Sequence, residues 1–171
     1  LARPLDLEDP RAAFTSNPHR PLSVHLDFHG LSPMYGGVAE DGALGTEMVF
    51  AKGHYEQHVR AVGKVHVDGT DYDVDGFGLR DHSWGPRSWQ SPKSYRWLTG
   101  QFDGGFGFMG SQSFTPKSGE LLSGFIFRDG KNHFVQPVRL ETRWSEPGQY
   151  QDEITLTLQG GDENLEIRGK V

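Results

Sequence analysis

Residues 54–79 read HYEQHVRAVGKVHVDGTDYDVDGFGL, and this stretch decides the fold class. Over residues 54–67 apolar and polar side chains alternate with a period of two, which is the pattern of a β-strand. Asp68-Gly69 is the dipeptide of a tight hairpin turn, and residues 72–79 then run back as a second strand. The stretch therefore predicts an antiparallel hairpin.

The same pattern continues on both sides of this hairpin. Further strands are predicted at residues 22–28, 95–102, 105–114, 121–127, 133–144, 150–158 and 165–171. Turn dipeptides separate most of them: Asp103-Gly104, Asp129-Gly130, Pro147-Gly148 and Gly160-Gly161. The sequence therefore predicts an all-β, antiparallel up-and-down sheet with little helix, closed as a barrel or folded as a sandwich.

The two remaining segments are predicted to be irregular. Residues 1–21 contain four prolines and offer only Arg11–Phe14 as a possible helical turn, so they read as an N-terminal arm or connector. Residues 30–45 are rich in glycine and read as a loop. Residues 22–171 are then expected to form one β-domain.

Composition excludes several classes of function. The chain of 171 residues contains no cysteine, so a disulfide framework, a thiolate nucleophile and a cysteine metal site are excluded. The net charge of -6 argues against nucleic-acid binding. There is no apolar run long enough to span a membrane and no signal-peptide pattern, so we expect a soluble, cytoplasmic protein. The chain begins with Leu, which suggests processing or a start within a longer polypeptide.

The densest group of chemically active side chains follows the hairpin, where a strand is expected to run into a loop. It comprises Arg80, Asp81, His82, Trp84, Arg87 and Trp89. Asp81 is the acid–base candidate because a carboxyl group beside tryptophans and arginines has a perturbed pKa. Gly76 and Gly78 are expected to allow close approach of a ligand or another backbone. The alternative is a buried Arg–Asp pair that anchors the loop.

A second polar group lies on the first strand of the hairpin. His54, Glu56 and His58 share one face of this strand. With His25 and His29 they could form a metal site of cupin type, although polar residues on one strand face are usually only solvated. We predict no metal and favour Glu56 as a partner of Arg80 or His82.

The later strands carry many aromatic residues. They are Trp97, Phe102, Phe106, Phe108, Phe114, Phe125, Phe127 and Phe134. These rings either form an ordinary core or line the cavity of a barrel that holds one apolar ligand.

The motif Gly-x-Gly-x-Arg-Asp-His-Ser-Trp-Gly at residues 76–85, followed by Pro-Arg-x-Trp, resembles a known signature. This is the D-H-x-W-G signature of the lipocalin-like hydroxyneurosporene synthase (carotenoid 1,2-hydratase) superfamily. Tyr55-Glu56-Gln57 and Tyr95-Arg96-Trp97 are similar to its uncharacterised bacterial branch. The specific match covers about residues 54–98, and the resemblance implies a lipocalin-like (calycin-type) barrel and a second such domain or a homo-oligomer.

The resemblance also implies a function. In the hydratase branch the Asp of the signature protonates an alkene, so this role falls on Asp81. We expect a cofactor-independent hydratase, lyase or isomerase that hydrates, dehydrates, isomerises or cyclises an apolar terpenoid-, steroid- or polyketide-like molecule at a double bond. The expected roles are: Asp81, His82 and Glu56 in catalysis; Arg80, Trp84, Arg87, Trp89, Trp97 and Tyr55 in substrate binding. The alternative is a non-catalytic carrier of a hydrophobic ligand.

Overall fold

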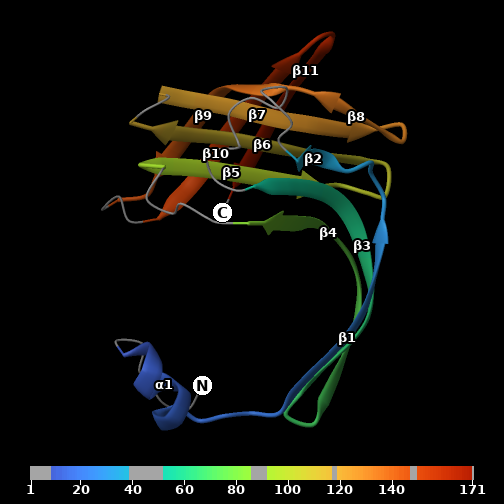
Figure 1. Cartoon of the computed structure of the whole chain (residues 1–171), viewed down its shortest axis with the longest axis vertical. Helices are drawn as coiled ribbons and strands as arrows, with labels where there is room; N and C mark the ends of the chain where they lie inside the picture. Colours follow the sequence, from blue (N-terminus) through green and yellow to red (C-terminus); the bar gives the residue numbers. More distant parts are fainter. Residues whose placement is uncertain (1–8, 39–51, 86–91, 117–118, 147–149, 171) are drawn as a thin grey trace. The chain divides into compact units, whose positions relative to one another are not determined.

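The computed structural model describes residues 9–38, 52–85, 92–116, 119–146 and 150–170. These ranges contain one short helix and eleven strands, so the predicted all-β class with little helix is confirmed (Figure 1). The strands form three sheets, and every pairing with a defined register is antiparallel. Within the described ranges no strand order closes into a ring, so barrel closure remains a prediction. No helix in these ranges is long and apolar enough to cross a membrane.

The chain divides into two compact units. Unit 1 comprises residues 1–27 and 62–75, and unit 2 comprises residues 28–61 and 76–171. Three strands contribute residues to both units: β1 (Leu22–Gly30), β3 (Gly53–Val67) and β4 (Thr70–Trp84).

Unit 1 begins with helix α1 (Pro10–Ser16), which contains the predicted helical turn. The Asp9 carboxylate caps its N-terminus by accepting hydrogen bonds from the backbone N–H groups of Arg11 and Ala12. Proline is favourable in the first turn because it has no N–H to leave unsatisfied. The start of the helix is therefore determined by local sequence, through Asp9 and Pro10.

The rest of unit 1 is the tip of the β3–β4 hairpin and the first part of β1. Asp68 and Gly69 have φ values of 49° and 84°, as the predicted turn requires. Lys64–Asp73 and His66–Asp71 pair across the two strands at 2.5 and 2.6 Å. None of the described side chains of unit 1 belongs to the buried core.

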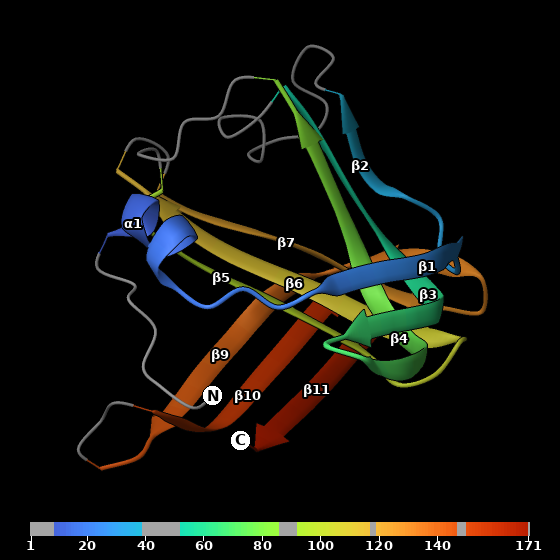
Figure 2. The same cartoon turned by 90° about the horizontal axis from the view of Figure 1, so that it is seen from below.

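Unit 2 is organised around the four-stranded sheet β5–β8. Its strands are β5 (Ser94–Gln101), β6 (Phe106–Thr115), β7 (Gly119–Arg128) and β8 (Lys131–Phe134). A second sheet contains β9 (Gln136–Trp144), β10 (Gln151–Gly160) and β11 (Glu163–Lys170). The strands of this second sheet cross those of the first (Figures 1 and 2).

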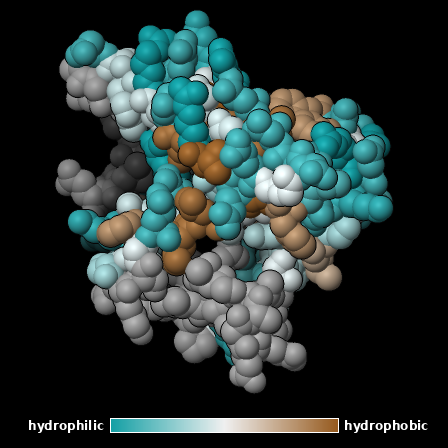
Figure 3. Space-filling model, turned by 90° about the horizontal axis from the view of Figure 1, so that it is seen from above, coloured by the Kyte–Doolittle hydropathy of each residue, from teal (hydrophilic) through white to brown (hydrophobic). Residues whose placement is uncertain are grey.

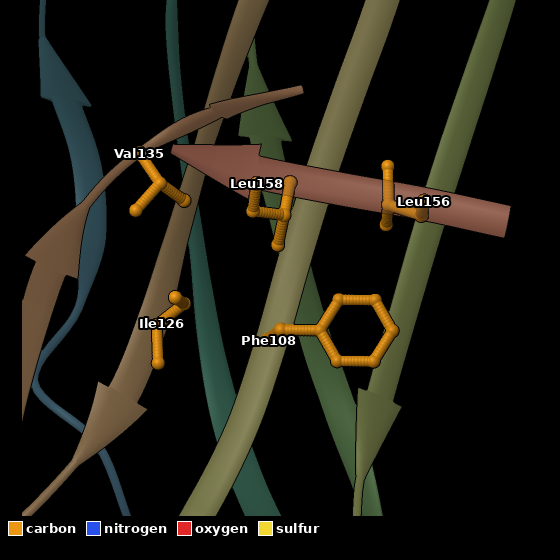
Figure 4. Close-up of a cluster of buried hydrophobic side chains, with 5 residues drawn as sticks. All are labelled: Phe108, Ile126, Val135, Leu156 and Leu158. Atoms are coloured by element: carbon orange, nitrogen blue, oxygen red, sulfur yellow. The ribbon is translucent and has the colours of Figure 1, made fainter. Parts of the chain in front are cut away.

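Strands β6 and β7 of the β5–β8 sheet carry buried residues on both faces, since alternate residues of a strand point in opposite directions. One face meets the second sheet through a core of Phe108, Ile126, Val135, Leu156 and Leu158 (Figure 4). The other face carries Met109, Phe125 and Phe127, against which Leu31, Tyr35 and Leu79 pack. This second cluster therefore joins β6 and β7 to the part of unit 2 that carries the motif.

Two strand predictions were wrong in detail. Residues 133–144 form two strands, β8 and β9, because the chain leaves one sheet at Val135, whose N–H donates to Gly124 O. The expected loop at residues 30–45 contains strand β2 (Tyr35–Val38), which pairs with β3. Residues 39–45 lie outside the described ranges.

The aromatic residues are divided between the core and the surface. Phe108, Phe125 and Phe127 are buried in packed clusters, as the ordinary-core alternative expected. Several other rings are exposed: Trp97, Phe102, Phe114 and Phe134. Hydrophobic residues gather in a patch among hydrophilic ones on the face drawn in Figure 3.

Candidate acid–base site

Residues 76–84 of the motif lie on a strand and not on a loop. Strand β4 continues through Trp84, whose carbonyl accepts a hydrogen bond from the N–H of Lys52. The next residue, Gly85, has a φ of +89°, which a residue with a side chain adopts only under strain. The prediction that a loop begins near residue 79 was therefore wrong, because pairing with β3 keeps residues 80–84 extended.

An extended backbone sends neighbouring side chains to opposite faces. Asp81 consequently lies with His54, whereas Arg80 and His82 lie with Tyr55. The sequence suggested that these three neighbours act together. The structure divides them between two faces of the β3–β4 hairpin.

The first face carries a carboxylate–imidazole pair. Asp81 Oδ1 and His54 Nε2 are 2.8 Å apart, and Glu56 Oε1 lies 3.6 Å from the same nitrogen. The side chains of Asp81, His54 and Glu56 are 45%, 24% and 4% exposed. We call Asp81, His54 and Glu56 the acid–base row, which runs from solvent into the protein. The row places two carboxylates around one imidazole nitrogen, an arrangement that can hold and transfer a proton.

His58 continues the polar positions of this face into the core. Its ring is fully buried and lies 5.3 Å from the ring of Phe125 and 6.1 Å from that of Phe127. Gly107 makes room for it, since a Cβ there would lie 2.9 Å from His58 Nε2. Burial lowers the pKa of His58, and the nearby Gln101 side chain opposes this effect only in part. The imidazole is thus held in its neutral form.

The second face carries a row of rings. The Arg80 guanidinium carbon lies 5.1 Å from the centre of the Tyr55 ring, within the range of a cation–π interaction. The Tyr55 and His82 rings are 5.4 Å apart, and the His82 and Trp84 rings are 5.5 Å apart. Gly53 leaves space for Trp84, because a Cβ at Gly53 would lie 2.2 Å from Trp84 Cζ2. We call Arg80, Tyr55, His82 and Trp84 the aromatic row.

Three expectations of the sequence analysis concern these contacts. Glu56 was expected to be a partner of Arg80 or His82; its Oε1 lies 3.6 Å from His54 Nε2 on the Asp81 face, whereas Arg80 and His82 lie with Tyr55 on the other face. Of the alternative Arg–Asp pair, the described contacts show Asp81 with His54 and Arg80 with Tyr55, and Arg87 lies outside the described residues. No atom of the described residues lies within 4 Å of a Cβ built at Gly76 or Gly78, so no described backbone approaches these glycines closely, and approach of a ligand stays a prediction.

Three more residues were predicted to bind substrate: Trp97, Arg87 and Trp89. Trp97 lies on β5, where its register partner is Ser111 of β6. Arg87 and Trp89 lie outside the described residues. Within the described ranges, no three histidine, aspartate or glutamate side chains are grouped to hold a metal ion.

His54 is the functional candidate whose role the sequence reasoning missed. A two-residue turn at Asp68-Gly69 fixes the hairpin register, which places residue 54 next to residues 81–83. The Lys64–Asp73 and His66–Asp71 pairs follow the same register. The same count places His54 opposite Ser83 and Glu56 opposite Asp81, so counting back from the turn would have put His54 diagonally next to Asp81 on one face of the hairpin.

A family described as "Domain of unknown function (DUF7064)" matches residues 5–171. The chain belongs to this family. The DUF7064 match includes both strands of the hairpin and therefore both rows. No curated protein and no solved structure matches the chain.

Proposed function

We propose that the chain is an acid–base enzyme that acts at a double bond of an apolar small molecule. The observation that carries this proposal is the 2.8 Å contact between Asp81 and His54 at the solvent-facing end of the acid–base row. Asp81 is the more exposed partner, so one of its carboxylate oxygens can meet a substrate while the other faces His54. Glu56 supports His54 from the buried side.

In a hydration, the proton leaves the Asp81–His54 pair and forms a C–H bond with the π electrons of the alkene. Water then bonds to the adjacent carbon, and the proton released from that water returns to the pair. Dehydration is the reverse sequence. In an isomerisation the pair removes a proton from one carbon and returns it to another, so no redox cofactor is required.

The proposed substrate class rests on the sequence resemblance. The resemblance of residues 76–85 to the hydroxyneurosporene synthase superfamily supports a terpenoid-, steroid- or polyketide-like substrate and a lipocalin-like barrel. The aromatic row lies on the opposite face of the hairpin from the Asp81–His54 pair, so it does not enter the proposed proton transfer. A second lipocalin-like domain or a second copy of the chain would complete the assembly.

Deuterium incorporation tests the proposal without knowledge of the natural substrate. The protein is incubated in D₂O with three probes: linalool, farnesol and a β,γ-unsaturated ketosteroid. We expect deuterium to enter a C–H position of at least one probe faster than without protein, as detected by mass spectrometry. Hydration and isomerisation transfer a proton to carbon, and dehydration does so in its reverse direction, so one readout covers them.

The same probes separate an enzyme from a carrier. A carrier binds a probe, as intrinsic tryptophan fluorescence would report, but leaves it unlabelled. Binding without labelling across the panel would reject catalysis on these probe classes and favour the carrier.

A further inference from the structure

Strand β1 belongs to a sheet with the strand order β1–β3–β2, in which β4 also pairs with β3. Strand β1 therefore lies at one end of this order. Its apolar side chains alternate with polar ones, and Leu22, Val24 and Phe28 are 65%, 55% and 63% exposed. A long edge strand with exposed apolar side chains is a site for pairing with another strand, unless charges or prolines protect it. Residues 22–30 contain no proline and only one carboxylate, Asp27.

The backbone orientation of β1 shows which residues face its outer edge. A Cβ built on Gly63 of β3 would lie 2.1 Å from His25 O, so the His25 carbonyl faces β3. Backbone groups of successive residues point to opposite edges of a strand. The N–H and C=O groups of Val24, Leu26 and Phe28 therefore face outward.

We propose that β1 pairs antiparallel with β1 of a second copy of the chain, around a two-fold axis at Leu26. Leu26 is the central residue of the strand Leu22–Gly30, so this register pairs the whole strand with its mate. Because the Leu26 backbone groups face outward, the two copies of Leu26 form a hydrogen-bonded pair on the axis. A two-fold interface requires a self-complementary surface, and this register supplies one.

The side chains show the complementarity. On one face His25 lies opposite Asp27 of the second copy, and Asp27 lies opposite His25 of that copy, so an imidazole N–H meets a carboxylate twice. On the other face Val24 lies opposite Phe28 of the second copy, and the two Leu26 side chains meet. A register shifted to place the axis at His25 would bring the two His25 rings together and would lose the His–Asp pairs.

Sedimentation velocity across a concentration series tests the dimer. We expect wild-type protein to dimerise with a Kd between about 10 µM and about 1 mM, which is typical of a small interface. His25→Asp places two carboxylates opposite each other at two symmetric positions and should weaken dimerisation at least about tenfold. Adding Asp27→His to that variant restores opposite partners and should restore the dimer.

His29→Asp is the matched control. It changes the same residue type on the same face of β1, but position 29 lies opposite Ser23 of the second copy. It should leave the Kd within about threefold of wild type. Wild-type protein that stays monomeric up to about 1 mM, or equal weakening by His25→Asp and His29→Asp, would overturn the proposal.

Disulfide trapping gives a second readout that does not depend on charge variants. The chain has no cysteine, so Leu26→Cys introduces a single thiol on the two-fold axis. Paired residues in this position have Cα atoms about 5.5 Å apart, within the range that a disulfide can bridge. We expect oxidation to give a covalent dimer for Leu26→Cys but not for Ser23→Cys, whose two copies lie far apart in this register. Equal trapping of both variants, or of neither, would contradict the proposed axis.

Discussion

Asp81 is nearly half exposed, and this exposure determines what its substitution should cost. Its side chain is 45% exposed, and its partner His54 lies in the same hairpin. An exposed ion pair contributes about 0.2–1 kcal/mol, whereas breaking a buried pair costs about 3–5 kcal/mol. We expect Asp81→Asn to lower the free energy of unfolding by less than about 1 kcal/mol, measured by urea denaturation. A loss of about 3 kcal/mol or more would instead identify Asp81 as a structural lock.

His58 should make the stability of the protein depend on pH. Its pKa is lowered by burial in the folded state, so the unfolded chain binds a proton more readily at this residue. Stability from the neutral imidazole is complete above the ordinary histidine pKa of about 6.5 and is lost as the pH falls below it. Thermal denaturation of wild type and His58→Gln at several pH values should show their difference in stability shrinking on acidification. A difference that is constant from neutral to acidic pH would contradict this expectation.

At the residue scale, the sequence identified Asp81 and Glu56 but not the contact between Asp81 and His54. Residue type and local clustering point to a carboxyl group among rings and arginines, which is why Asp81 was found. The partner depends on strand register, and the assumption of a loop after residue 79 removed the register from consideration. The direction of each side chain could be predicted only once residues 80–84 were known to be extended.

Two glycines in strands provide a matched test of packing at the element scale. A Cβ at Gly124 of β7 would lie 2.5 Å from the backbone oxygen of Met109, whereas Gly78 of β4 has no described atom within 4 Å. Gly124→Ala forces the backbone of β6 to move and should destabilise the protein by about 1–3 kcal/mol. Gly78→Ala should be neutral or stabilise it by up to about 1 kcal/mol, because alanine restricts the unfolded chain.

Urea denaturation of both variants measures this difference. Equal effects would show that the close approach of β6 and β7 at Gly124 does not limit packing. A large loss from Gly78→Ala would show that the space beside β4 is occupied in solution.

At the element scale, turns and alternation predicted most strands well. Asp129-Gly130 forms a turn with φ values of 53° and 73°, as Asp68-Gly69 does. Prediction failed where tertiary packing decides the ends of strands. Residues 133–144 alternate without interruption, yet the chain passes from one sheet to another at Val135, and local sequence pattern does not encode that change.

At the scale of the whole molecule, the two units differ in their buried core. The described part of unit 1 contributes no residue to the buried core, whereas β6 and β7 carry core residues on both faces. Local stability follows buried apolar contact. In dilute protein we therefore expect the backbone amides of residues 64–73 to exchange with solvent at least about tenfold faster than those of β6 and β7. Hydrogen-exchange mass spectrometry measures both segments, and equal protection would contradict a stability difference between the units.

The all-β class could be predicted from composition and alternation, because both reflect the chain's local preferences. The arrangement into three sheets could not, since it depends on which apolar face meets which. The DUF7064 match shows the family, whereas the lipocalin-like barrel remains a proposal based on the sequence resemblance. The proposed function rests on the geometry of the hairpin.

The measurement that tests the proposed function most directly is solvent-deuterium incorporation by wild type, Asp81→Asn and Asp73→Asn, side by side. Asp73 is a matched control because it is an 84% exposed aspartate at the far end of the same hairpin. We expect labelling of a probe by wild type and by Asp73→Asn, and at least about a hundredfold slower labelling by Asp81→Asn, because general acid–base groups contribute factors of this size. Equal labelling rates in all three proteins would contradict the assignment of proton transfer to Asp81 and His54.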